Sequence, residues 1–155
     1  MCADASLGNL PDSGSQAGYL VFLVDCEGNA ALIDWKSHKI RRIVRSTLAA
    51  ETLAMSDAVD ATMLVASTWC EFIGCDTMKP VECITDCHSL YDNVNSTKMC
   101  TEKRLRIDIA GLKEMQERGE MVLHWTDTKN QLADPLTKKG VPTLDLMKVL
   151  STGHL

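Results

Sequence analysis

The sequence lacks the signals of a secreted, membrane-spanning or zinc-binding protein. Its 7 cysteines form no C-x-x-C pair and have no histidine at zinc-site spacing, so we interpret them as reduced, mostly buried thiols. The N-terminal residues contain neither the basic segment nor the apolar core of a secretory signal. No apolar run is long enough to span a bilayer. These absences predict an intracellular protein that is not secreted and has no membrane partner.

The chain also lacks an overall positive charge, internal repeats and low-complexity linkers. A formal net charge of −5 argues against a protein that coats nucleic acid over its whole surface, but it allows a local basic patch. With 155 residues and 45% hydrophobic content, the chain can bury one sizeable core and is too short for two ordinary domains. We predict one domain over residues 1–140 and a C-terminal helical tail over 141–155.

Hydrophobic patterns in the first half predict three strands and a long helix. A first strand contains Asp4, and residues 19–25 and a segment from Ala30 form a hairpin around a turn at 27–29. From Ser46 the apolar residues recur at three- and four-residue steps to residue 73, which predicts a helix capped by Ser46 or Thr47.

The second half alternates short strands with helices. Strands are predicted at 81–85 and 121–125, helices at 88–95 and 102–118, and an apolar segment at 144–150. Antiparallel strands followed by helix-connected strands predict an α+β fold. We expect a mixed α/β three-layer arrangement, with a five-stranded mixed sheet and helices on both faces.

Several acidic residues occupy positions in this pattern where a carboxylate is unusual. Glu51 lies on the apolar stripe of the long helix, where a charge is costly unless it is paired, protonated or bound to a cation. Asp86 follows the strand at 81–85, at an edge of the sheet where ligands commonly bind. Asp4 lies in the first strand and Asp134 precedes Pro135.

Each acid also has a local structural interpretation, and the local pattern does not decide between the two. Arg45 could pair with Glu51, Asp86 could cap the helix at 88–95, and Asp4 could start a turn. Asp134 before proline fits a helix N-cap, and Thr128 with Gln131 fits a capping box. If the fold brings the four acids together, their repulsion requires divalent cations, and hard oxygen ligands suit Mg²⁺ or Mn²⁺.

Longer segments resemble the ribonuclease H domain of copia-type retrotransposon Pol polyproteins. The resemblance covers most of the chain in the family's order, and RSTLAAE (45–51) and QLADPLTK (131–138) are its most specific pieces. It implies a ribonuclease H-like fold whose catalytic, metal-binding acids fall on Asp4, Glu51, Asp86 and Asp134. It implies two Mg²⁺ ions, with Mn²⁺ as a substitute, and endonucleolytic hydrolysis of the RNA strand of an RNA/DNA hybrid during reverse transcription. A reverse transcriptase domain of the same element would be a partner.

Basic residues next to the long helix support nucleic-acid binding independently of the resemblance. An acid-free basic run reaches from Lys36 to Arg45, and such residues contact phosphates without reading sequence. A second cluster at 98–106 fits a solvated charged face equally well. The residues that we predict to contact nucleic acid are Lys36, Lys39, Arg42, Arg45, Ser46, His88 and Lys129.

The sequence departs from the family pattern in two places. Lys129 stands roughly where cellular and retroviral ribonucleases H place a mobile histidine, and we interpret His124, within a strand, as structural. Only three residues precede Asp4, so we expect a first strand that is truncated relative to the family. The alternative is therefore a catalytically inactive retroelement remnant that retains only nucleic-acid binding. Strand transfer, as in integrase relatives, fits the QLAD motif less well.

Overall fold

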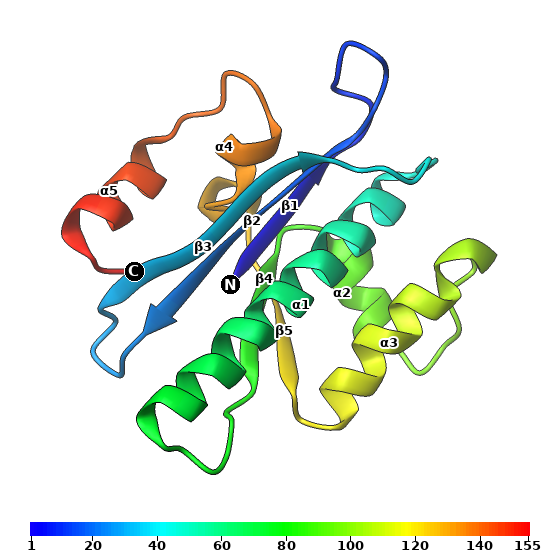
Figure 1. Cartoon of the computed structure of the whole chain (residues 1–155). Coiled ribbons are helices and arrows are strands. Elements are labelled where there is room, and N and C mark those ends of the chain that lie inside the picture. The colour runs from blue at the N-terminus through cyan, green and yellow to red at the C-terminus, as the bar shows by residue number, and fades with distance from the viewer.

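A computed structural model describes all residues, 1–155, and contains one five-stranded mixed sheet. The strand order is β3-β2-β1-β4-β5 (Figure 1). β1 pairs antiparallel with β2, as β2 does with β3, whereas β1 and β4, and β4 and β5, pair in parallel. The strands are β1 (Cys2–Ser6), β2 (Gln16–Val24), β3 (Ala30–Lys39), β4 (Val81–Thr85) and β5 (Met121–Trp125).

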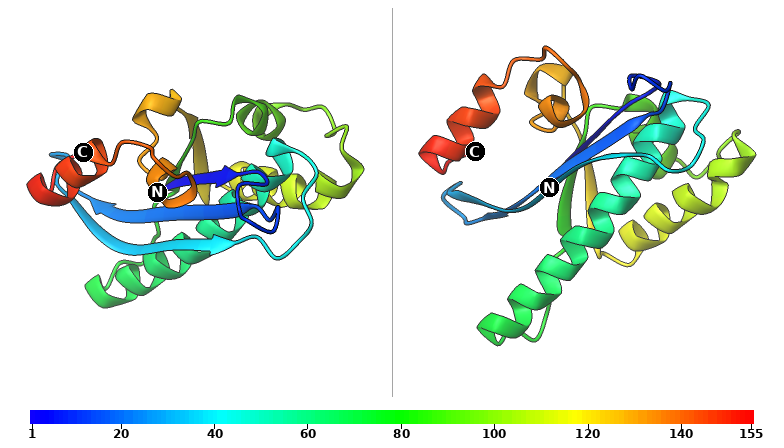
Figure 2. Two further views of the ribbon diagram at one scale, coloured as in Figure 1. Left: turned by 90° about the horizontal axis from the view of Figure 1, so that it is seen from above. Right: turned by 45° about the horizontal axis from the view of Figure 1, so that its top comes forward.

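Helices cover both faces of this sheet, which confirms the predicted three-layer arrangement. α1, α2 and α3 lie together on one face, and α4 and α5 lie on the other (Figures 1 and 2). None of the helices combines the length and the apolar character that crossing a membrane requires. The helices are α1 (Thr47–Ile73), α2 (His88–Asn95), α3 (Arg106–Glu117), α4 (Asp134–Thr137) and α5 (Leu144–Thr152), with short 3₁₀ turns η1 (Lys103–Leu105) and η2 (Thr128–Asn130).

α1 is the long helix that the apolar periodicity predicts. The Ser46 hydroxyl accepts a hydrogen bond from the Ala49 N–H at 3.1 Å, so Ser46, one of the two predicted candidates, is the N-cap. Gly74 ends the helix in the left-handed conformation, with φ 68°. The first four turns bury their apolar face on the sheet, whereas the last turns extend past it and leave Phe72 81% exposed (Figure 2).

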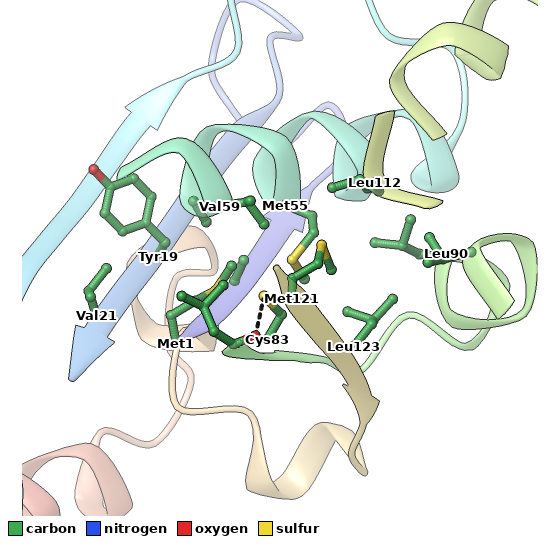
Figure 3. Packing of buried hydrophobic residues seen from close by; sticks show 14 residues of the cluster. Met1, Tyr19, Val21, Met55, Val59, Cys83, Leu90, Leu112, Met121 and Leu123 are labelled. Atoms are coloured by element: carbon green, nitrogen blue, oxygen red, sulfur yellow. Dashed lines mark hydrogen bonds between the residues drawn. The ribbon is translucent and has the colours of Figure 1, made fainter. Parts of the chain in front are cut away.

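The main core lies between the sheet and the face covered by α1, α2 and α3. Met55 of α1 packs against Leu90 of α2, Met121 of β5 and Cys83 of β4 (Figure 3). These four side chains are at most 1% exposed. Full burial of large apolar side chains from four elements fixes the position of β4, after which Asp86 follows.

Two predicted boundaries differ from the structure. The hairpin arms are longer than the apolar pattern indicates, because Gln16 still pairs with Lys39, and polar residues on the exposed edge strand conceal the pairing. The helix predicted at 102–118 is divided into η1 and α3, with buried Leu105 at the junction. Neither difference changes the order of the elements.

The segment that follows α4 returns to the sheet. α5 contacts β3, the Ala30 N–H donates to the Gly153 carbonyl at 2.7 Å, and the Leu155 N–H donates to the Gly28 carbonyl at 3.0 Å. The predicted helical tail over 141–155 thus contains a helix, and its end is hydrogen-bonded to the turn between β2 and β3.

Candidate metal centre

Asp4 and Asp86 come together because β1 and β4 are parallel neighbours. Cys2 pairs in register with Ile84, so Asp4 and Asp86 each lie two residues further along adjacent strands. Asp4 is within β1 and 0% exposed, whereas Asp86 is just beyond β4 and half-buried. The side chains of Ala3 and Ala5 pack in the clusters with α1, whereas that of Asp4 contacts Thr137 of α4 on the opposite face.

Asp134 reaches the same place through the loop after β5. The Gln131 side-chain amide donates to the Ala3 carbonyl at 2.9 Å, which joins this loop to β1 beside Asp4. Asp134 then opens α4 and is 5% exposed. One carboxylate oxygen from each of Asp4, Asp86 and Asp134 lies within 4.8 Å of the other two. Acids that are far apart in the sequence therefore form one cluster.

Glu51 is outside this group of three but close to it. Its side chain on α1 is 4% exposed, and it has no ion pair with Arg45, which excludes the simplest structural interpretation of this acid. Burial, together with the charges of Asp4 and Asp86, raises the pKa of Glu51 to about 9. A proton or a cation is needed to keep this carboxyl group in place at neutral pH.

Thr137 and Lys138 hold the carboxylate of Asp4. The Thr137 hydroxyl donates to Asp4 Oδ2, and the Lys138 ammonium lies 3.2 Å from Asp4 Oδ1 and 2.7 Å from Asp134 Oδ1. Burial raises the pKa of Asp4 to about 6, against the opposing effects of Thr137 and Lys138 and with the help of Asp134 and Asp86. Partial burial lowers the pKa of the Lys138 ammonium group. The hydrogen bonds and negative charges of Asp134 and Asp4 have a larger, opposite effect, so the pKa is raised overall.

The structure does not show the local caps that the sequence left open for these acids, because their polar groups have tertiary partners. Thr128 and Gln131 form no capping box: the Thr128 hydroxyl donates to Asp86 Oδ2 at 2.7 Å, and Gln131 bonds β1. Asp86 does not cap α2, whose N-cap residue is Cys87. Asp134 is the first residue of α4 and not its N-cap. Neither Asp86 nor Asp134 is therefore explained by a local cap.

Three of the predicted nucleic-acid contacts, Lys36, Lys39 and Arg42, line a groove. This groove, of about 910 Å³, lies between β3 and α1, and none of the four acids lines it. His88 and Lys129 instead lie close in sequence to Asp86 and Asp134, and both are exposed. The groove is lined by Lys36, His38, Lys39, Ile40, Arg41, Arg42, Leu53 and Asp57.

Several of these predicted contacts already have intramolecular partners. Lys39 pairs with Asp12, and Arg42 lies 3.2 Å from Asp108, both at exposed positions. Ser46 caps α1 and also donates to Glu102 at 2.8 Å. Arg45 has no ion pair, and exposed His88 lies 2.9 Å from Asp92. Exposed pairs are weak and exchange readily for phosphate contacts, whereas the half-buried Ser46 hydroxyl is engaged by both the first turn of α1 and Glu102.

Solved structures share this architecture. LC11-RNase H1, in complex with an RNA/DNA hybrid, superposes with a TM-score of 0.63 at 16% identity, over 87% of this chain and 90% of that chain. Ribonuclease H1 from the halophilic archaeon Halobacterium salinarum NRC-1 gives a TM-score of 0.57 at 16% identity, over 92% and 94% of the two chains. The N-terminal ribonuclease H domain of a Mycobacterium tuberculosis protein gives 0.60 at 12% identity, over 97% and 95%. The chain has the ribonuclease H fold.

This likeness is one of structure and not of sequence. No protein-family model matches the chain, and no curated protein matches it. Within the ribonuclease H fold, the structure brings Asp4, Asp86 and Asp134 together and places Glu51 beside them. The residues that hold this site together, namely Thr128, Gln131, Thr137 and Lys138, were not predicted in these roles from the sequence. Three of the four lie within QLADPLTK and the fourth just before it, but their long-range contacts leave no local pattern.

Proposed function

We propose that this protein is an endonuclease that hydrolyses the RNA strand of RNA/DNA hybrids with the help of divalent metal ions. The observation that carries the proposal is the convergence of Asp4, Asp86 and Asp134 within 4.8 Å on a ribonuclease H fold. The raised pKa values of Asp4 and Glu51, about 6 and about 9, support a site whose carboxylates lack sufficient positive charge from the protein alone.

The donor set fits a hard cation. Carboxylate oxygens are the ligands that Mg²⁺ and Mn²⁺ prefer, and no cysteine or histidine belongs to the cluster. Asp4, Asp86, Asp134 and Glu51 would hold two Mg²⁺ ions, with Mn²⁺ as a substitute. Bound ions would supply Lewis-acid activation of water and of the phosphodiester.

The remaining groups of the site position these acids. Thr128 orients the carboxylate of Asp86 through its hydroxyl, and Thr137 orients that of Asp4. Gln131 fixes the loop that carries Asp134 onto β1. Such outer contacts typically change metal affinity or activity about 10- to 100-fold when they are removed.

Substrate would be bound chiefly through its backbone. Lys36, Arg41 and Arg42 line the groove beside α1, and exposed His88 and Lys129 lie near Asp86 and Asp134 in the sequence. A hybrid that contacts both regions would be held by phosphate contacts, while the 2′-hydroxyl groups of its minor groove would distinguish RNA from DNA. One similar solved protein, LC11-RNase H1, is described in complex with an RNA/DNA hybrid, which supports this choice of substrate.

We further propose that the chain acts in a copia-type retrotransposon, next to a reverse transcriptase domain of the same element. The support is the sequence resemblance in RSTLAAE and QLADPLTK. In that setting, the protein would remove template RNA after DNA synthesis. The test is whether the purified reverse transcriptase domain of the same element binds this chain and produces a hybrid that the chain degrades.

The decisive experiment uses a labelled RNA/DNA hybrid with and without Mg²⁺. We expect endonucleolytic cuts in the RNA strand that need Mg²⁺, and no comparable cutting of single-stranded RNA or duplex DNA. Asp86→Asn should abolish the activity, whereas Asp92→Asn, which removes an exposed carboxylate six residues later on α2, should retain it. A protein that binds the hybrid but cuts nothing would instead be the inactive remnant.

A further inference from the structure

The Lys138 ammonium group contacts the carboxylates of Asp4 and Asp134, two of the acids that would hold the metal. Nζ is 2.7 Å from Asp134 Oδ1 and 3.2 Å from Asp4 Oδ1. The other oxygen of Asp4 accepts the Thr137 hydroxyl. Both oxygens of Asp4, a residue that is 0% exposed, are therefore engaged by the protein itself. A divalent ion that binds Asp4 and Asp134 must therefore share or replace an existing interaction.

We propose that Lys138 is a built-in counter-ion for the metal-free site, which competes with the divalent ion for Asp4 and Asp134 and leaves these oxygens when the ion binds. This inference rests on the proposed function, because it assumes that the cluster holds metal. It adds that the protein carries a tethered competitor that sets the affinity for that metal.

Charge explains why the metal-free site needs such a residue. Three carboxylates within 4.8 Å repel one another, and for a buried acid such as Asp4 this repulsion adds to the cost of desolvation. Lys138 directly follows α4 and lies four residues after Asp134, so its stem reaches back over that acid. Its charge keeps the acids together before any ion arrives.

Distance explains why the ammonium must move. Mg²⁺ binds carboxylate oxygens at about 2.1 Å. An ion on Asp134 Oδ1 would therefore lie at most about 5 Å from an ammonium that is 2.7 Å from the same oxygen. Two positive charges at this distance in a partly buried site repel each other. The Lys138 side chain is 32% exposed, so a path to solvent is open to it.

Metal binding to the purified protein, without nucleic acid, tests the proposal directly. Mn²⁺ and Mg²⁺ are titrated by calorimetry into wild type, Lys138→Gln, Lys138→Arg and Lys139→Gln. We expect Lys138→Gln to bind Mn²⁺ about five- to tenfold more tightly than wild type, because the competitor is gone. Lys138→Arg keeps a cation in place, and Lys139→Gln removes an exposed charge next to it, so both should stay close to wild type.

Thermal melting gives a second signature. Without metal, Lys138→Gln should melt at a lower temperature than wild type, and Mn²⁺ should raise its melting temperature by more than it raises that of wild type. A folded Lys138→Gln protein with unchanged or weaker Mn²⁺ affinity would overturn the proposal, since Lys138 would then support the bound ion or have no role in binding.

One further measurement needs no variant and covers the case in which Lys138→Gln does not fold. In the ¹H–¹⁵N spectrum of lysine ammonium groups of wild type, the slowly exchanging signal of Lys138 should be present without metal and vanish at saturating Mg²⁺. A signal that persists with Mg²⁺ bound would contradict displacement. If wild type and Asp86→Asn show the same lack of Mn²⁺ binding, the metal site itself fails, and the proposed function fails with it.

Discussion

Gly18 on β2 is the register partner of Asp4 on β1, and α4 packs directly over it. A Cβ atom at Gly18 would lie 2.7 Å from Leu136 Cβ and 3.0 Å from Thr137 Cγ2. The absence of a side chain at Gly18 therefore allows α4, with Asp134 and Thr137, to approach Asp4. The distance between Asp4 and Asp134 therefore depends on Gly18, a residue that has no side chain.

Gly18→Ala should displace α4 and weaken the metal centre. We expect a loss of about 1 to 3 kcal/mol in the free energy of unfolding, as for other overpacked positions. Urea denaturation measures this loss, and calorimetry should show weaker Mn²⁺ binding. Gly111→Ala on α3 is the matched control: no atom lies within 4 Å of its added Cβ, and alanine should stabilise the helix by about 0.5 to 1 kcal/mol. If both substitutions change the free energy of unfolding equally, the close approach of α4 to Gly18 is not the cause of the loss.

Thr128→Val should reduce cleavage without unfolding the protein. The hydroxyl that orients Asp86 Oδ2 at 2.7 Å is removed, while the shape of the exposed side chain is kept. We expect activity on the hybrid to fall about tenfold, in the range seen for outer contacts of metal ligands. Thr128→Ser keeps the hydroxyl and should restore most of the activity. If the serine variant is as slow as the valine variant, the hydrogen bond is not what matters.

The stability of the metal-free protein should fall as the pH rises from 5 to 9. The pKa of Glu51 in the folded protein is about 9, above its ordinary value of 4.5, and that of Asp4 is about 6, above 3.8. Acids with raised pKa values favour folding while they are protonated, and this contribution is lost as the pH rises through the folded value. For Asp4 the loss is complete slightly above pH 6, and for Glu51 it continues to about pH 9.

Glu51→Gln isolates the part of this dependence that comes from Glu51. Glutamine cannot lose a proton, so the variant should melt at a higher temperature than wild type at pH 8 in the presence of a chelator. A gain of about 3 °C corresponds roughly to 1 kcal/mol for a domain of this size. At pH 4 the two proteins should melt close together. Parallel melting curves across the whole pH range would show that Glu51 is not protonated in the folded state.

Binding of the hybrid should depend strongly on salt through the groove beside α1. Lys36 and Arg41 line this groove and have no ion-pair partner in the protein. Replacing both by Gln should weaken binding and reduce the slope of log affinity against log salt by about 1 for each phosphate that is no longer neutralised. Lys148→Gln on α5 is the control and should leave the slope unchanged. Fluorescence anisotropy at several salt concentrations measures the effect.

Elements with strong local patterns were predictable from the sequence. The bounds of α2, β4 and β5, and the Ser46 cap of α1, agree with the prediction, because apolar periodicity and capping chemistry act over a few residues. The order of strands and helices, with the resemblance, also predicted the fold that the solved structures share. The pattern drew attention to the acids of the cluster, but it was the resemblance that assigned them to one metal site.

The contacts between these acids and their partners were not predictable. Thr128 and Gln131 match a capping box in the sequence, but Asp86 and the Ala3 carbonyl bind their polar groups in the folded chain. Lys138 looks like an ordinary charge at the end of a short helix, and its partner Asp4 is 134 residues away. Local patterns contain no information about partners that only the strand order brings close.

The last stretch of the chain is attached to the same hairpin at both of its ends. α4 is bonded to the hairpin arms, since Gln16 and Ser37 both donate to the Leu136 carbonyl, and residues 153–155 are bonded to the hairpin turn at 28–30. The turn is exposed and lies far along the hairpin from the acids, yet both ends of residues 136–155 depend on that hairpin (Figure 1). An insertion in this turn would therefore act on the anchor of residues 153–155, which is the far end of the segment that begins beside Thr137 and Lys138.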